Sequence, residues 1–74
     1  MRIRLFGMIA EKAGTDHLEV NAGSLDELRA MLAQRIQGLD GIRHAIAVDR
    51  RIVQSDIVLT GSEEIAVLPP FAGG

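Results

Sequence analysis

The sequence ends in Ile65-Ala66-Val67-Leu68-Pro69-Pro70-Phe71-Ala72-Gly73-Gly74, a strand-like apolar run followed at once by two prolines. Proline has no amide donor and holds φ near −65°, so the chain leaving Leu68 can continue neither a central strand nor a helix. Residues 69–74 are therefore expected to form an extended tail that leaves the folded domain. At roughly 3.3 Å per residue, this tail could hold the terminal carboxylate up to about 20 Å from the folded body.

The last two residues determine what such a tail could do. Gly73 and Gly74 lack Cβ atoms, so they can enter a channel too narrow for side chains, and the group they offer a partner is the α-carboxylate of Gly74. A frayed terminus is the alternative, because the last residues of most chains are poorly ordered. The prolines, the apolar side chain of Phe71 and the absence of a linker before Pro69 favour a tail presented to a partner.

Length and composition exclude several classes of protein. The 74 residues make one small domain, near the lower limit for a single core. Because 47% of the residues are hydrophobic and only two are aromatic, the core must be aliphatic. The net charge of −2 and the scattered basic residues argue against nucleic-acid binding. No apolar run is long enough to cross a membrane, so a cytoplasmic location is expected. There is no cysteine, so any sulfur that this chain handles must be carried by another group.

Alternating and helical patterns predict the first half of the chain. Residues 1–6 and 17–20 are typical of strands, and residues 8–13 are typical of a short helical turn that Gly14 ends. Ser24-Leu25-Asp26-Glu27 fits a capping box. In this motif the Ser24 side chain accepts a hydrogen bond from the Glu27 amide, and the Glu27 side chain accepts one from the Ser24 amide. Apolar residues at helical spacing then predict one long helix, with Gly38 as its C-cap.

The second half is predicted to be mostly strand. Residues 45–48 and 51–53 are expected to pair through a hairpin corner at Asp49-Arg50, and residues 65–68 form the last strand. One helix across one face of a mixed sheet predicts an α+β fold with the ubiquitin-like β-grasp arrangement. The domain is expected to span residues 1–68 and the tail residues 69–74.

The same arrangement predicts a docking surface. The first and last strands would lie parallel at the centre of the sheet, with four alternate residues against the helix: Ile3, Leu5, Ile65 and Val67. Phe6 and Leu68 would then face away from the helix, beside Pro69 and Phe71. Such an apolar patch usually marks a docking surface, so Phe6, Leu68 and Phe71 are predicted to bind a partner. The alternative is that Phe6 folds over the rim of the sheet as ordinary core.

No catalytic set and no metal site are predicted. His17 and His44 lie in separate elements, without a cluster of further ligands. Ser24 is better explained as a helix cap than as a nucleophile. Glu63-Glu64 is interpreted as a pair of solvated carboxylates that could steer a basic partner. We expect the chain to bind no cofactor and not to be catalytic alone.

The ending from Glu64 to Gly74 resembles that of the small, sulfur-carrying subunit of molybdopterin synthase, of the MoaD/ThiS type. Chains of that family end in an acidic turn, an apolar strand, Pro-Pro and Gly-Gly. Three further stretches are similar to the family's first strand, short helix and main-helix start: Leu5-Phe6-Gly7, Ala13-Gly14-Thr15 and Ser24-Leu25-Asp26-Glu27-Leu28. The chain departs from the family at Thr60-Gly61-Ser62-Glu63-Glu64, where Asp-Gly-Asp-Glu is usual, and at Asp49, where Asn is usual.

This resemblance implies a function for the tail. Gly74 would be adenylated by an E1-like activating enzyme, which uses the ATP, and would then receive sulfur from a donor protein as a thiocarboxylate. Five residues would present it: Pro69, Pro70, Phe71, Ala72 and Gly73. The large synthase subunit, which holds the catalytic residues, would use the sulfur to build the dithiolene of the molybdenum cofactor. The family suggests a heterotetramer of the two subunits.

Three other functions stay open. A thiamine-pathway sulfur carrier has a similar fold and a Gly-Gly end, although it usually lacks the Pro-Pro. A ubiquitin-like modifier would be conjugated through Gly74 to lysines of target proteins. A non-catalytic binding module would not need a free C-terminus at all.

Overall fold

The computed structural model describes residues 1–69, so the predictions made for Pro70, Phe71, Ala72, Gly73 and Gly74 lie outside the described residues. The elements are β1 (Arg2–Leu5), α1 (Gly7–Ala13), β2 (His17–Glu19), α2 (Leu25–Arg35), the 3-10 helix η1 (Leu39–Gly41), β3 (Ala45–Val48), β4 (Arg51–Ile52) and β5 (Ile65–Leu68). The strands and helices predicted from the sequence are present, with ends that differ by a residue or two. Of the helices within residues 1–69, none has the length and apolar character that a membrane span requires.

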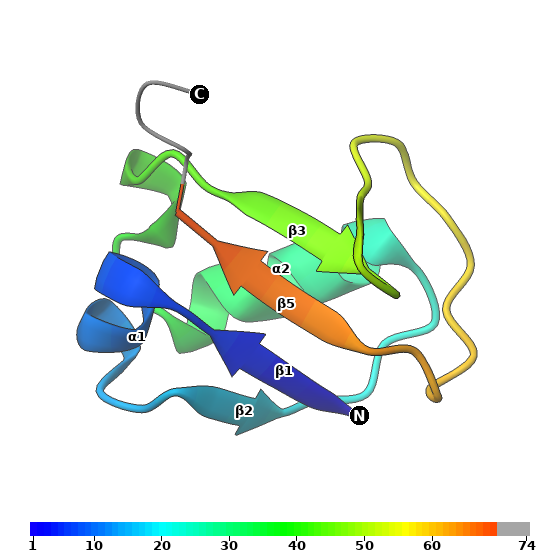
Figure 1. The fold of residues 1–74 in the computed structure, drawn as a ribbon, viewed down its shortest axis with the longest axis horizontal. Helices are drawn as coiled ribbons and strands as arrows, with labels where there is room; N and C mark the ends of the chain where they lie inside the picture. Colours follow the sequence, from blue (N-terminus) through cyan, green and yellow to red (C-terminus); the bar gives the residue numbers. More distant parts are fainter. Residues whose placement is uncertain (70–74) are drawn as a thin grey trace.

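The strands form one mixed sheet in the order β2-β1-β5-β3-β4, with β5 at its centre. β1 and β5 run parallel, with Ile3 opposite Ile65 and Leu5 opposite Val67, whereas the other neighbouring strands are antiparallel. Figure 1 shows α2 crossing behind the sheet and α1 beside the carboxyl ends of β1 and β5. The prediction of an α+β, β-grasp fold is confirmed.

The core lies between one face of the sheet and α2. Ile3, Ile65 and Val67 are fully buried, as are four residues of and directly after α2: Leu25, Leu28, Leu32 and Ile36. Burying a side chain of this size is worth roughly 1.5–3 kcal/mol. This aliphatic layer therefore fixes the sheet on the helix, and α2 does not cover the opposite face of the sheet.

The ends of α2 differ in detail from the prediction. Ser24 Oγ accepts a hydrogen bond from the Glu27 amide at 3.2 Å, as expected, but Glu27 Oε1 accepts from the Gly23 amide at 3.1 Å, not from that of Ser24. A β-bridge between Ser24 and Val58 fixes the backbone directly before the helix. The helix ends at Arg35 with Ile36 as its C-cap, and Gly38 (φ +83°) is the N-cap of η1, so the prediction of Gly38 as the C-cap is wrong. Ile36 takes an extended conformation that buries its side chain.

The β3–β4 hairpin is tied to the start of β5. Its corner residues Asp49 and Arg50 have φ of 51° and 71°, a left-handed pair that matches the twist of a two-residue hairpin. The Asp49 amide donates to Glu64 O at 2.8 Å, and Asp49 Oδ1 accepts from the Glu64 amide at 2.9 Å. These bonds fix where β5 enters the sheet.

Candidate functional site

The face of the sheet opposite α2 carries the residues predicted to bind a partner. β5 buries Ile65 and Val67, while Ala66 and Leu68 point to the opposite face and are partly exposed. Phe6, directly after β1, is 40% exposed. The orientation predicted for Phe6 and Leu68 is therefore confirmed, and the alternative of Phe6 as a core residue is wrong. Their role in docking stays a prediction.

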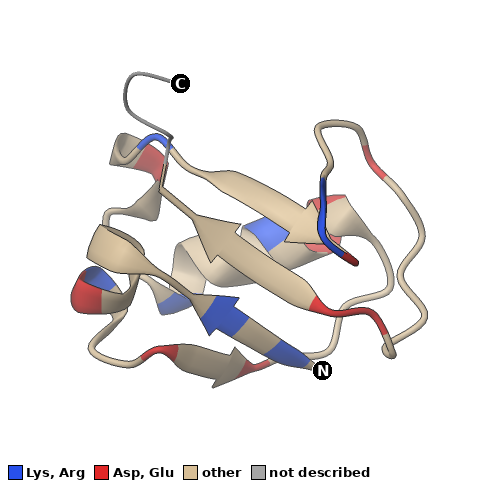
Figure 2. Ribbon diagram, in the orientation of Figure 1, with Lys and Arg blue, Asp and Glu red and all other residues tan. Residues whose placement is uncertain are grey.

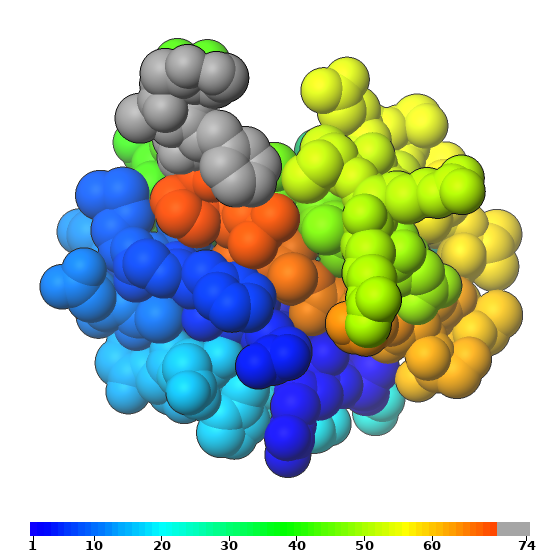
Figure 3. Space-filling model, in the orientation of Figure 1, coloured from blue at the N-terminus to red at the C-terminus, as the bar shows by residue number. Residues whose placement is uncertain are grey.

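An apolar groove of about 330 Å³ runs along this face over β5. Its floor is formed by Ala47 and Ala66, which lie opposite each other in the β3–β5 ladder. These small side chains leave a depression between Phe6 on the β1 side and Ile52, which is 47% exposed, on the β4 side. Figure 3 shows the surface of β5, in orange, between β1 in blue and the β3–β4 hairpin in yellow-green. An exposed apolar concavity on a small protein usually binds an apolar group of a partner.

The groove ends where the tail leaves the sheet. Leu68 lines this end of the groove, and Pro69 follows it, half-buried. Pro69 is the one predicted tail residue that lies within the described part of the chain. Phe71, the third predicted docking residue, lies outside it.

Charged side chains surround the apolar groove. At the end away from Pro69, Arg50 Nε lies 3.9 Å from Glu64 Oε1, and an exposed pair of this kind adds little stability. On the β1 side, the Arg4 guanidinium lies 5.6 Å from the centroid of the Phe6 ring, within range of a cation–π contact. β1 contains Arg2 and Arg4, and Figure 2 shows basic residues in blue along this strand. A basic side chain, that of Arg4, therefore lies beside Phe6 on this side of the apolar groove.

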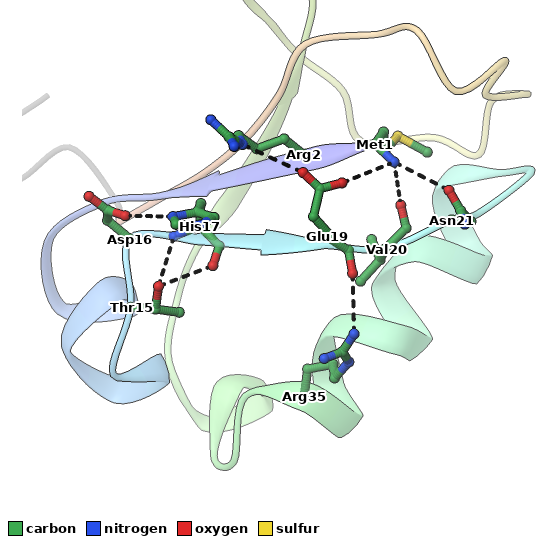
Figure 4. Close-up of polar contacts among 9 residues, drawn as sticks. All are labelled: Met1, Arg2, Thr15, Asp16, His17, Glu19, Val20, Asn21 and Arg35. Atoms are coloured by element: carbon green, nitrogen blue, oxygen red, sulfur yellow. Dashed lines mark hydrogen bonds and ion pairs between the residues drawn. The ribbon is translucent and has the colours of Figure 1, made fainter.

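Contacts between β1 and β2 hold the β1 side of the site in place (Figure 4). The N-terminal ammonium of Met1 donates to Val20 O at 2.7 Å and to Asn21 Oδ1 at 3.3 Å. Glu19 is the last residue of β2, and its Oε1 lies 3.5 Å from Nε of Arg2 on β1. β1 is thus fixed between β2 and β5, and Phe6 is fixed with it.

The residues set aside as catalysts have structural partners. His17 Nδ1 lies 2.9 Å from Asp16 Oδ1, and this hydrogen bond holds the pKa of the Asp16 carboxyl below its ordinary value. His44 Nδ1 lies 2.6 Å from Ile42 O. Across residues 1–69, no three His, Cys, Asp or Glu side chains gather as a metal site would require.

Glu63 has a structural role that the sequence did not reveal. Its Oε2 accepts from the Thr60 amide at 2.7 Å and from the Thr60 hydroxyl at 3.0 Å, and its Oε1 accepts from the Gly61 amide at 2.9 Å. These hydrogen bonds, chiefly the one from the Thr60 amide, lower the pKa of the Glu63 carboxyl from 4.5 to about 2. Glu63 remains accessible to solvent, as interpreted, and in addition it closes the turn that leads into β5.

We expect the stability that Glu63 contributes to depend on pH. Its pKa is lower in the folded chain than in the unfolded chain, so its contribution is fully present above about pH 4.5 and is lost as the pH falls towards 2. Glu63→Gln cannot ionise, so it should melt at a lower temperature than the wild type at neutral pH. The two melting temperatures should converge between pH 4.5 and pH 2. A constant difference over that range, measured by circular dichroism, would contradict this role.

Three groove residues were missed by the sequence reasoning: Ala47, Ile52 and Ala66. The signal that could have found them is the two-residue corner at Asp49-Arg50, which sets Ile52 opposite Ala47 in the hairpin. Alternation along β3 then places Ala47 on the face away from Ile46 and Val48, which are buried against α2. The small size of the alanines, and not their exposure, creates the groove.

Known proteins share both the sequence pattern and the fold. The model of the ThiS family matches residues 3–74. The chain is similar to one in the protein-protein complex of subunits 1 and 2 of molybdopterin-converting factor from Helicobacter pylori 26695, with 31% identity, a TM-score of 0.72 and coverage of 99% of this chain and 96% of that chain. No curated protein matches the sequence.

Two archaeal structures share the fold at lower identity. The first is small archaeal modifier protein 1 from H. volcanii, with 16% identity, a TM-score of 0.81 and coverage of 95% of each chain. The second is small archaeal modifier protein 1 from Methanosarcina acetivorans, with 20% identity, a TM-score of 0.77 and coverage of 99% of this chain and 94% of that chain. At these identities the likeness concerns the fold alone.

Proposed function

The chain belongs to the ThiS family of ubiquitin-like sulfur carriers, and we propose that it is the sulfur-carrying small subunit of a molybdopterin synthase. In this role it carries sulfur as a thiocarboxylate on Gly74 for dithiolene formation in molybdenum cofactor biosynthesis. The observation that carries the proposal is the 31% identity, over nearly the full length of both chains, with a chain of the complex of molybdopterin-converting factor subunits 1 and 2.

The proposed chemistry takes place on the carbonyl carbon of Gly74. A carboxylate is a poor electrophile, so an activating enzyme transfers AMP from ATP to the Gly74 carboxylate and releases pyrophosphate. A hydrosulfide equivalent from a sulfur-donor protein then attacks the carbonyl carbon, and AMP leaves. One oxygen has been replaced by sulfur, which gives a thiocarboxylate that is more nucleophilic than the carboxylate. In this proposal the ATP binds to the activating enzyme and not to this chain, and the step takes place in the cytoplasm.

The apolar groove is the proposed docking site for the large subunit. The support for this assignment is its place on the sheet, because the groove runs along β5 and ends at Leu68, directly before Pro69. A partner bound over Phe6, Ala66 and Leu68 would therefore lie next to the point where the tail begins. Phe71 would extend the apolar contact, Pro69 and Pro70 would set the direction of the tail, and Gly73 would allow passage through a narrow channel.

Intact mass spectrometry of the protein from its native host tests the proposal. We expect a chain that ends at Gly74, part of it heavier by the mass difference between sulfur and oxygen, with that difference on the C-terminal peptide. Adducts in which Gly74 is joined to lysines of other proteins would favour a ubiquitin-like modifier instead. The absence of both products, in cells that make the molybdenum cofactor, would reject a carrier role.

A thiamine-pathway carrier is the second candidate, favoured by the name of the family whose model matches. Its C-terminal chemistry would be the same, so the mass difference cannot separate it from the first candidate. The partner can. Copurification of a molybdopterin synthase large subunit would support the proposal, and copurification of a thiazole-forming enzyme without that subunit would overturn it.

A further inference from the structure

The contact between Gly7 and Pro69 joins the start of α1 to the start of the tail. We propose that Gly7 is a positioning residue for the tail: its missing Cβ leaves the space in which the Pro69 ring packs, and this contact sets the direction in which the chain leaves β5. The inference rests on the proposed function, because it concerns how the carboxylate of Gly74 is delivered to a partner.

The space around Gly7 is closed by Pro69. A Cβ atom on Gly7 would lie 3.1 Å from Cγ, 3.7 Å from Cδ and 3.9 Å from Cβ of Pro69. Gly7 also has a φ of +57°, a conformation that residues with side chains rarely adopt. Two independent features, one of the backbone and one of the contact, therefore favour glycine here.

The backbone on both sides holds Gly7 in place. The Phe6 amide donates to Val67 O at 3.3 Å, which extends the pairing of β1 with β5 by one residue, and Phe6 O accepts from the Ile9 amide at 3.1 Å. Pro69 has no N–H, so it cannot donate a ladder hydrogen bond as Phe6 does. Its packing on Gly7 limits its position instead. Because the ring also holds φ near −65°, a fixed ring gives a fixed direction to the chain that follows.

Gly14 provides a matched control on the same helix. It ends α1 with a φ of +75°, and a Cβ there would meet nothing within 4 Å. Gly14→Ala thus introduces the backbone strain of a positive φ without a contact to the tail. Any loss that Gly7→Ala shows beyond Gly14→Ala is due to the contact with Pro69.

The test compares these two variants as substrates of the activating enzyme from the same host. The reaction is measured as the release of pyrophosphate from ATP, at a temperature where both variants are folded. We expect Gly7→Ala to lower kcat by about 10- to 100-fold relative to Gly14→Ala, because a misplaced reacting group is costly. KM should agree within about twofold, since neither substitution removes a side chain that the activating enzyme could contact. The Pro69→Ala background removes Cγ and Cδ of the ring. In that background, Gly7→Ala should lower kcat no more than Gly14→Ala does.

Equal kcat values for Gly7→Ala and Gly14→Ala would overturn the positioning role, as would a Gly7→Ala penalty that persists in the Pro69→Ala background. Nuclear Overhauser effects between the α protons of Gly7 and the ring protons of Pro69 test the contact in the free protein. Their absence would also overturn the proposal. A wild-type chain that supports no pyrophosphate release and carries no sulfur would reject the proposed function, and the delivery role with it, even with the contact present.

Discussion

Adding one alanine after Gly74 is expected to abolish thiocarboxylate formation while the fold and partner binding survive. The extra residue moves the carboxylate by about 3.3–3.6 Å and places a Cβ where the proposed channel accepts only glycine. A displacement of roughly 1 Å in a reacting group can already cost about 100-fold in rate, so the activity should fall by at least that factor. The measurement is the yield of thiocarboxylate, by mass spectrometry, after incubation with the activating enzyme, ATP and sulfide.

The extended chain provides its own control. Removing the added alanine with a carboxypeptidase should restore the activity, which would show that the loss came from the position of the carboxylate and not from misfolding. An unchanged circular dichroism spectrum and unchanged binding to the large subunit complete the control. Full activity of the extended chain would mean that the carboxylate of Gly74 is not the working group, and would favour a binding module.

Local patterns in the sequence predicted most of the fold. Alternation in residues 1–6 and 65–68 correctly assigned Ile3, Leu5, Ile65 and Val67 to the core. The Ser24 cap and the apolar spacing from Leu25 located α2. These predictions are correct because each depends on residues that are close in the sequence. In addition, once alternate residues of a strand are assigned to the core, the residues between them must lie on the opposite face of the sheet. The exposure of Phe6 follows from the same argument.

The features that were missed depend on contacts between distant parts of the chain. Gly7 and Pro69 lie near opposite ends of the sequence and meet only because β1 and β5 are parallel neighbours. The groove floor requires the register that sets Ala47 opposite Ala66. The sequence reasoning missed the hydrogen bonds that the solvent-accessible Glu63 carboxylate accepts from Thr60 and Gly61, because they depend on how the turn is folded. A sequence pattern predicts on which face of the sheet a residue lies, but the pairing of strands decides which side chains come together in a site.

The apolar groove and the tail exit have separate tasks in the proposed function. The groove supplies binding energy, which affects the affinity for a partner, and the Gly7–Pro69 contact supplies direction, which affects the rate once the partner is bound. Substitutions in the groove should therefore change Kd, and substitutions at the exit should change kcat. This separation allows the docking surface to be tested without an activity assay.

Phe6→Asp is expected to weaken binding of the large subunit by about 2 kcal/mol or more, which is a rise in Kd of roughly 30-fold. The substitution removes one wall of the apolar groove and places a carboxylate where an apolar group of the partner should lie. The fold should tolerate it. Phe6 is 40% exposed and is the N-cap of α1 without a side-chain capping bond, a position that aspartate favours. The free energy of unfolding should change by less than about 1 kcal/mol.

Val58→Asp is the matched control, because Val58 is an apolar residue that is 80% exposed and does not line the groove. It adds the same charge, so it corrects for any general electrostatic effect on association, and it should bind the large subunit as the wild type does. Leu68→Asp should also weaken binding, but Leu68 is half-buried and paired with Ala45 in the sheet, so some loss of stability is expected. Calorimetry with the purified large subunit separates the outcomes. Equal affinities for Phe6→Asp and Val58→Asp would place the docking surface elsewhere, because a residue that forms a wall of the occupied groove cannot be replaced by a charge without cost.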